Sequence, residues 1–196
     1  MLVFALGIKA VGKSRVIAEL NGLGAGIREV SYGDVMLEIA KEEEGIKDRE
    51  EIAKLPAAKQ NAIRDAAAKR IRAMADKEKL VFLNTHGFIY TIPHHTYLPG
   101  SPDKVSDVLK PDFILLAEAA PEAIIERRER DLKAGRMREI GTIEEVSTAL
   151  FGERVAAIHL AARYGVELKF FDNSLPAERN SEAIAALAQL FKKLGG

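Results

Sequence analysis

The chain has 196 residues and 29 basic and 29 acidic side chains, so its formal net charge of zero argues against a nucleic-acid partner or a charged membrane surface. It contains no cysteine, which excludes disulfides, thiolate catalysis and cysteine-based zinc sites. Met1 leads directly into an apolar run, without a signal-like region or an apolar span of about 20 residues, and we therefore expect a cytoplasmic protein of one domain.

Five short apolar runs without strict alternation predict the strands of a buried parallel sheet, at residues 2–6, 27–31, 80–83, 113–117 and 166–171. Helical segments fill the intervals: Pro56 and Pro121 each open one, and Thr142 with Glu145 has capping-box spacing before a helix that reaches Tyr164. This alternation indicates an α/β fold. Residues 85–102, with three prolines and two glycines, predict a long ordered loop of functional importance.

A phosphate-binding motif follows the first predicted strand. Residues 7–14 read GIKAVGKS and match G-x-x-x-x-G-K-[ST]. Glycines let the backbone N–H groups turn toward an anion, and the next helix directs its positive end to the same point. Lys13 would bridge the β- and γ-phosphates, and Ser14 would bind Mg²⁺ directly. The motif predicts a three-layer P-loop fold that binds a nucleoside triphosphate, expected to be ATP in view of the resemblance given below, through Gly7, Ile8, Lys9, Ala10, Val11, Gly12, Lys13 and Ser14; the alternative is a glycine-rich turn without nucleotide.

Three further segments favour a kinase that acts on a second nucleotide. SYGDVM ends the second predicted strand, LNTHG ends the third, and RRERDLKAGRMREIGT follows the fourth. No guanine-recognition signature is present, which argues against a GTPase. The arginine-rich stretch has two other interpretations, a solvated helix face of alternating charge or an RNA-binding patch, although no aromatic residues interleave with it.

The chain resembles the archaeal type of adenylate kinase, a branch of the nucleoside monophosphate kinases, over nearly its whole length. The resemblance is carried by GIKAVGKS, YGDVM, DRE with KL and a downstream Gln60, THG followed by YLPG, the arginine-rich stretch and FGERVAA. It implies Mg²⁺-dependent in-line transfer of a phosphoryl group from ATP to AMP. It also implies a five-stranded parallel sheet, a helical AMP-binding segment at about residues 32–76 and a short lid at about 131–142.

Carried over by position, the resemblance assigns roles to particular side chains. Arg127 would stack on the ATP adenine, and Arg49 would pair with the AMP phosphate. The rest of the AMP site would be Tyr32, Gly33, Asp34, Gln60, Thr85, His86, Tyr97 and Leu98. The catalytic cations would be Lys13, Arg130, Arg136, Arg138 and Arg154. These fixed charges suit a reaction in which two polyanions meet and no protein nucleophile is needed.

Two positions depart from the family pattern. Asn84 stands where the family usually has an aspartate that holds Mg²⁺ through water, and an amide brings no negative charge to that place. We expect Asp34, at the end of the neighbouring strand, to compensate, with Asn84 also acting through water. Ala53 stands where an arginine is common, which removes one phosphate contact that Lys54 replaces only as a point charge.

Other functions remain open from the sequence. One is a kinase for another monophosphate, such as CMP or UMP, because the segment 85–102 diverges; another is a nucleotide-binding switch whose Asn84 has weakened catalysis. A transition-metal site at His86, His94 and His95 is less favoured, because adjacent side chains of an extended segment point to opposite sides. Archaeal relatives are often trimers, so the resemblance implies a homo-oligomer. An apolar stripe on the helix at residues 144–164 is either a surface for such contacts or part of the core.

Overall fold

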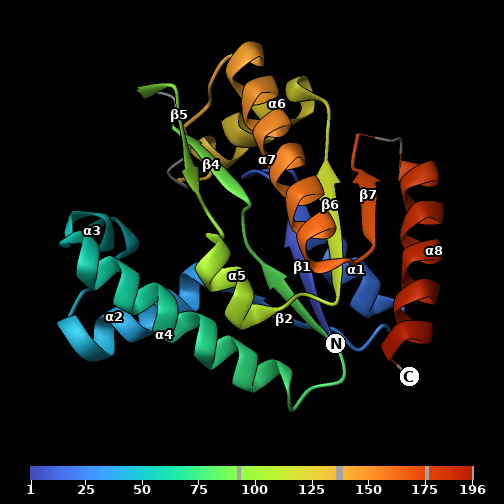
Figure 1. The fold of residues 1–196 in the computed structure, drawn as a ribbon. Coiled ribbons are helices and arrows are strands. Elements are labelled where there is room, and N and C mark those ends of the chain that lie inside the picture. Colours follow the sequence, from blue (N-terminus) through green and yellow to red (C-terminus); the bar gives the residue numbers. More distant parts are fainter. Residues whose placement is uncertain (92–93, 136–138, 175–176, 196) are drawn as a thin grey trace.

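The computed structural model describes residues 1–91, 94–135, 139–174 and 177–195. Its main sheet has five parallel strands in the order β2-β3-β1-β6-β7 (Figure 1). The strands are β1 (Leu2–Leu6), β2 (Arg28–Ser31), β3 (Val81–Asn84), β6 (Phe113–Glu118) and β7 (Leu168–Asp172). All five predicted strands are confirmed, the first with its exact boundaries and the others with boundaries shifted by at most two residues. The P-loop α/β fold and its five-stranded parallel sheet are therefore as predicted.

Eight helices are assigned among the described residues. They are α1 (Lys13–Gly22), α2 (Tyr32–Glu44), α3 (Arg49–Lys54), α4 (Ala57–Ala75), α5 (Asp103–Leu109), α6 (Pro121–Lys133), α7 (Ile143–Tyr164) and α8 (Ala177–Gly195). Thr142 and Glu145 form the predicted capping box at the start of α7, and Pro121 occupies the first turn of α6. No helix in these described ranges is both long enough and apolar enough to cross a membrane.

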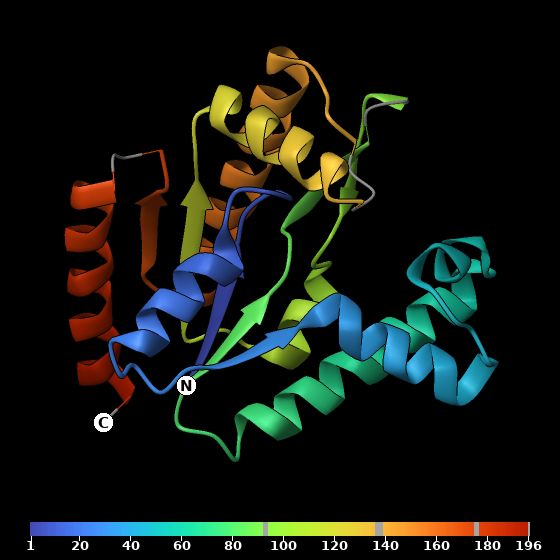
Figure 2. The same ribbon diagram turned by 180° about the vertical axis from the view of Figure 1, so that it is seen from behind.

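The helices cover both faces of the sheet. On one face of the sheet α1 and α8 lie side by side (Figure 2). They bury an apolar cluster that includes Leu20 and Phe191. On the other face residues from α2, α4, α5 and α7 form a second cluster that includes Ile39, Ile71 and Leu160. Alternation along the central strands supplies both clusters, since Phe4 faces the second and Ala5 the first. The result is a three-layer core with α2, α3 and α4 extending beyond one sheet edge (Figure 1).

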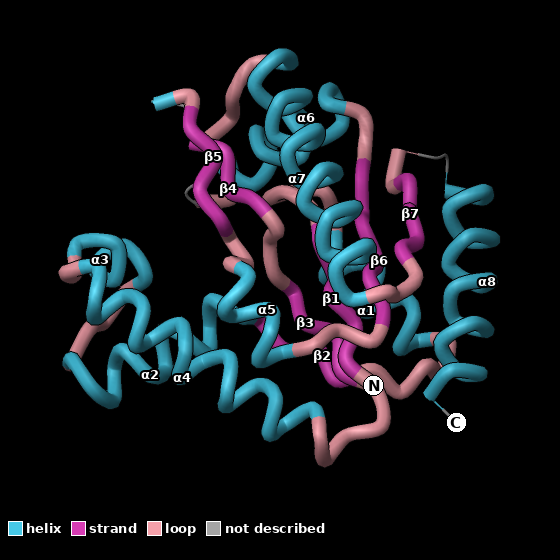
Figure 3. Tube along the Cα trace, in the orientation of Figure 1, coloured by secondary structure: helices cyan, strands magenta, loops and turns pink. Residues whose placement is uncertain are grey.

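The segment predicted as a loop, residues 85–102, contains an antiparallel hairpin. β4 (Phe88–Thr91) pairs with β5 (Thr96–Pro99), and the hairpin lies beside α7 (Figure 3). Tyr97 donates a 2.5 Å hydrogen bond to the Thr148 carbonyl of α7, and a Cβ on Gly152 would overlap the Tyr97 ring. The loop prediction was wrong for these residues: their prolines signalled a break, but Pro99 ends an edge strand, where a missing N–H is tolerated.

Candidate active site

The loop between β1 and α1 is shaped to present backbone N–H groups. Gly7 and Gly12 have φ values of 141° and 100°, which residues with a Cβ rarely adopt. A Cβ on Gly7 would lie 2.6 Å from the carbonyl oxygen of Ala117, and one on Gly12 would overlap the Asn173 amide. Both glycines are therefore required by the close approach of neighbouring segments as well as by the turn.

Lys13 is buried in the curve of this loop, where its Nζ donates to the carbonyl of Gly7 and, at 3.5 Å, to that of Ile8. Burial lowers the pKa of Lys13 to about 8, an effect opposed by the negative charges of Glu153 and Glu29. The ammonium group is thus charged at neutral pH and lies where an anion held by the loop would meet it.

Glu153 of α7 is a buried carboxylate that sequence reasoning missed. Oε1 accepts from the Gly7 N–H at 2.8 Å, and Oε2 accepts from the N–H groups of Gly87 and Phe88 at 3.0 and 2.9 Å. Burial alone would raise the pKa of Glu153. The net pKa is nevertheless below its usual range, because the carboxylate is stabilised by His86, by the Phe88 N–H and by the charge of Lys13. Burial and Lys13 lower the pKa of His86, whose Nδ1 lies 3.7 Å from Glu153. Through these hydrogen bonds Glu153 connects the phosphate-binding loop to the start of the hairpin.

Ser14 at the start of α1, Glu29 within β2 and Asn84 at the end of β3 meet through their side chains. The Ser14 hydroxyl donates to Glu29 Oε1 at 2.9 Å, and the Asn84 amide donates to the same oxygen at 3.2 Å and to Ser14 Oγ at 3.3 Å. Glu29 was not predicted. Asp34, the acid expected beside Asn84, instead forms an ion pair with Arg49.

A cavity of about 630 Å³ joins the phosphate-binding loop to the helical arm α2–α4. Residues of the loop, the strand ends, the arm and the hairpin line it: Ile8, Lys9, Ala10, Gly12, Lys13, Ser14, Arg15, Ser31, Tyr32, Gly33, Met36, Arg49, Arg64, Asn84, Thr85, His86, Ile89, Pro99 and Gly100. The cavity is large enough to hold much of a nucleotide, and residues of both the loop and the arm line it.

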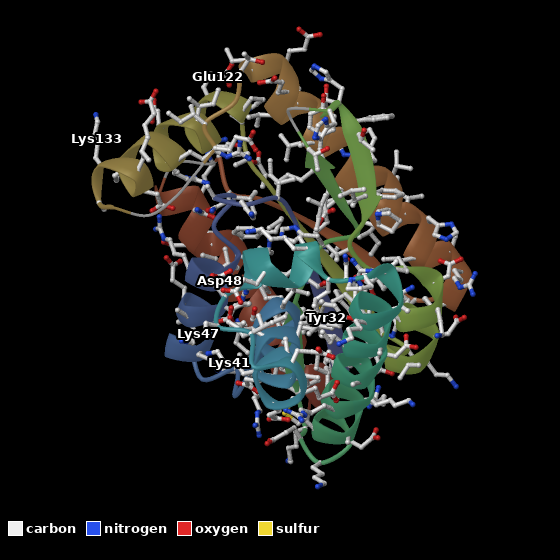
Figure 4. The ribbon with its side chains drawn as sticks, turned by 90° about the vertical axis from the view of Figure 1, so that its left-hand side faces the viewer. Tyr32, Lys41, Lys47, Asp48, Glu122 and Lys133 are labelled. Carbon is white, nitrogen blue, oxygen red and sulfur yellow. The ribbon has the colours of Figure 1, made fainter. Side chains whose placement is uncertain are left out.

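The arm contributes two arginines to the cavity. Arg49 also donates to Ser31 Oγ at 3.4 Å, and the absence of a Cβ on Gly33 lets the guanidinium lie against the backbone. The second, Arg64, was not predicted. Tyr32 is held by a 3.0 Å hydrogen bond from its hydroxyl to the Arg64 carbonyl, and it lies between α2 and α4 (Figure 4). Burial raises the pKa of Tyr32, which stays neutral.

Several predicted acceptor residues lie outside the cavity lining. Gln60 donates to the carbonyls of Ala53 and Leu55 at 3.1 and 2.8 Å and so braces the turn between α3 and α4. Tyr97 and Leu98 are on β5, exposed, with Tyr97 against α7. Thr85 and His86 do line the cavity, and Ser101 fixes both through a 3.2 Å contact with Thr85 Oγ1 and a 2.9 Å bond to the His86 carbonyl.

The arginines after β6 lie in different settings. Arg127 donates to the carbonyls of Val11 and Asn173 at 2.9 and 2.8 Å, and burial with the charges of Arg15 and Arg130 lowers its pKa. Arg154 forms two bonds to Glu118, at 2.9 and 2.6 Å. Arg130 is exposed on α6. The predicted catalytic residues Arg136 and Arg138 lie outside the described residues.

The described part of the chain contains no group of three or more His, Cys, Asp or Glu side chains placed to hold a metal ion. His95 Nδ1 is within 2.7 Å of the Tyr90 hydroxyl, on the hairpin. The geometry gives the histidine metal site no support.

A glycine-shaped loop with a buried lysine, at the carboxyl end of a parallel sheet and open to a cavity shared with the helical arm, defines a P-loop nucleotide-binding protein. Residues 6–147 match a family model described as an AAA domain. The chain is 38% identical to the adenylate kinase of Methanopyrus kandleri over 98% of both chains, and 36% identical to that of Methanocaldococcus jannaschii over 88% of this chain and 89% of the relative. The chain belongs to the adenylate kinase family, and it is a nucleoside monophosphate kinase.

A solved structure from Chloroflexus aurantiacus J-10-fl is similar to the chain with a TM-score of 0.54, covering 97% of each chain at 14% identity. This likeness concerns the fold alone.

Proposed function

We propose that this protein transfers the γ-phosphoryl group of ATP to AMP and yields two molecules of ADP. The observation that carries the proposal is one cavity whose lining combines Lys13 and Ser14 of the phosphate-binding loop with Tyr32 and Arg49 of the arm. An in-line transfer needs donor and acceptor phosphates in one compartment, with fixed cations around the moving group. The names of the relatives support ATP and AMP as the two substrates.

On the donor side, the loop N–H groups and Lys13 would hold the triphosphate. Arg127 would border the adenine, since its guanidinium already lies against Val11 and Asn173 at the outer side of the loop. Arg130 and Arg154, with Arg136 and Arg138, would neutralise the transferring phosphoryl group when a lid at residues 131–142 closes. Arg154 would exchange its partner Glu118 for phosphate in that step.

On the acceptor side, the helical segment at residues 32–76 would hold AMP within the single domain. Arg49 would bind the AMP phosphate as a bidentate donor and leave Asp34. Tyr32, Thr85 and His86 would contact base and sugar, and Arg64 adds a second guanidinium to the same wall.

The residues near Ser14 fit a magnesium ion. The Ser14 hydroxyl and the Glu29 carboxylate bring oxygen atoms together there, the ligands that Mg²⁺ prefers, and the Asn84 amide donates its N–H groups to both. When bound, the ion would neutralise charge that develops during transfer. The chain's own part is to orient the Ser14 oxygen and to keep the phosphates beside Lys13.

The proposal is tested by incubating the protein with Mg²⁺-ATP and each nucleoside monophosphate while following diphosphate formation. ADP formed with AMP at the highest kcat/KM supports it. A preference for CMP or UMP would show that the protein is a kinase with a different acceptor nucleotide. Nucleotide binding without any transfer would instead support the interpretation as a nucleotide-binding switch.

We further propose that α7 mediates self-association. Phe151, Val155 and Ile158 lie on one side of this helix at spacings of four and three residues and are 67%, 43% and 52% exposed. Such a contiguous apolar stripe is typical of a protein interface. The family resemblance makes a homotrimer the expected assembly.

A further inference from the structure

We infer that Glu29, on the edge strand β2, is the carboxylate that positions the cation-binding hydroxyl of Ser14, and that Asn84 serves to hold Glu29. The inference rests on the proposed function, because it concerns the Mg²⁺ that accompanies ATP. It replaces the expectation that Asp34 compensates for the missing acid at position 84. It gives Asn84 a task other than holding the metal.

The hydrogen bond that the Ser14 hydroxyl donates sets the orientation of its oxygen. A serine hydroxyl that offers its oxygen to a cation must donate its hydrogen elsewhere, and the acceptor then fixes which lone pair faces the ion. Glu29 Oε1 accepts that hydrogen at 2.9 Å. The pleat explains the approach: Val30 packs on the arm side of the sheet, so Glu29 and Ser31 face the side of α1.

Asn84 is oriented by Glu29. An ionised carboxylate only accepts hydrogen bonds, so the Asn84 atom facing Glu29 is the amide nitrogen, which donates at 3.2 Å. An aspartate at position 84 would instead face Glu29 with a second negative charge. An amide at 84 and an acid at 29 are therefore a matched pair, with the carboxylate on β2, one strand outward from β3.

The other candidates explain the contacts less well. Edge strands often carry charged side chains that discourage pairing with other chains, and Arg28 with its partner Glu78 fits that use. Glu29 is also exposed, yet its carboxylate is bonded to the first turn of α1. Asp34 is paired with Arg49 on the arm, whereas Glu29 is bonded to Ser14 and Asn84.

The test measures how Mg²⁺ changes nucleotide affinity, by titrating a non-hydrolysable ATP analogue with and without EDTA, and follows Mn²⁺ binding to the analogue complex by electron paramagnetic resonance. In Glu29→Gln the half-saturating Mg²⁺ concentration should rise about 10-fold or more, as for other losses of metal-positioning groups. The affinity in EDTA should stay the same or tighten, since a negative charge near the triphosphate is gone. Glu78→Gln, which removes a carboxylate from the same sheet edge without touching Ser14, should match the wild type.

A double variant separates positioning from structural damage. Glu29→Gln with Asn84→Asp returns one carboxylate to the pair and should recover the wild-type Mg²⁺ dependence to within a few-fold. The inference is overturned if Glu29→Gln leaves the Mg²⁺ titration unchanged, if it weakens analogue binding equally in EDTA, or if the double variant is no better than the single one. These readouts do not involve the acceptor, so they are independent of whether AMP is the substrate.

Discussion

The backbone N–H of Gly7 donates a 2.8 Å hydrogen bond to Glu153, a residue 146 positions further along the chain. The same carboxylate holds Gly87 and Phe88, so one buried side chain joins the phosphate-binding loop, α7 and the entry to the hairpin. A Cβ on Gly87 would overlap that of Ala156, one turn further along α7. The shape of the loop therefore depends on α7 as much as on its own glycines.

Replacing Glu153 by Gln should destabilise the fold by about 1–3 kcal/mol, because the amide NH₂ must face at least one backbone N–H donor. Glu144→Gln, on the exposed first turn of α7, is the matched control. The pKa of Glu153 is lowered in the fold, so its contribution is present above the ordinary carboxyl pKa and is lost as pH falls through the lowered value. Thermal unfolding should show the largest wild-type advantage near neutral pH and a shrinking one in acid. A deficit that does not change with pH would contradict this account.

ATP binding should raise the pKa of Lys13, because the phosphates replace carbonyl partners with full negative charges. With a pKa of about 8 before binding, the site should take up about half a proton at pH 8. Calorimetry in buffers of different ionisation enthalpy measures this uptake. Lys13→Met should abolish it and phosphoryl transfer, whereas Lys79→Met should not. Uptake that persists in Lys13→Met would assign the proton to another group.

Arg49→Ala should raise the KM for AMP by about one to two orders of magnitude, the loss expected for charge-assisted hydrogen bonds of about 1.5–3 kcal/mol. The Kd for ATP should change little, since the loop residues are untouched. Arg70→Ala removes an arginine from the same arm, where it pairs with Glu42, and should leave both constants near wild type. Equal effects on ATP and AMP would show that Arg49 stabilises the arm and not the acceptor.

Gly152→Ala should detach the hairpin from α7, because the new methyl group overlaps the Tyr97 ring. We expect a loss of about 1–3 kcal/mol, typical of overpacking. Hydrogen exchange should increase in β4 and β5. In the double variant Gly152→Ala with Tyr97→Ala the second substitution should cost much less than it does alone. Strict additivity would argue against the contact.

Phe151→Glu should shift the protein toward monomers in light scattering, since it places a charge in the α7 stripe. Glu144→Lys changes charge on the same helix outside the stripe and serves as the control. If Phe151→Glu has the same molar mass in solution as the wild type, the α7 stripe is not part of the interface.

The parts of the fold that the sequence predicted have local signals. Each of these signals can be recognised within a few residues: the apolar runs, the helix caps and the GIKAVGKS motif. All of them lie where the sequence predicts them. Glu153 and Arg64 were missed because a charged residue on a long helix normally faces solvent, and only packing against distant segments shows otherwise. Glu29 did have a signal: it shares a pleat face with Ser31, beside the strand that ends in Asn84. Alternation along the chain predicts the strands and the face of each side chain. Which side chains meet across the sheet follows only once the order of the strands is known.

The pairing of Arg49 with Asp34 has a consequence for small anions under the proposed acceptor role of Arg49. An incoming anion would have to displace an internal carboxylate to reach the guanidinium. A chloride ion, with one diffuse charge, would have little advantage over that carboxylate, whereas a phosphate monoester would offer more charge and two oxygens in the right plane. The ion pair would thus act as an internal competitor that favours nucleotides over simple salts.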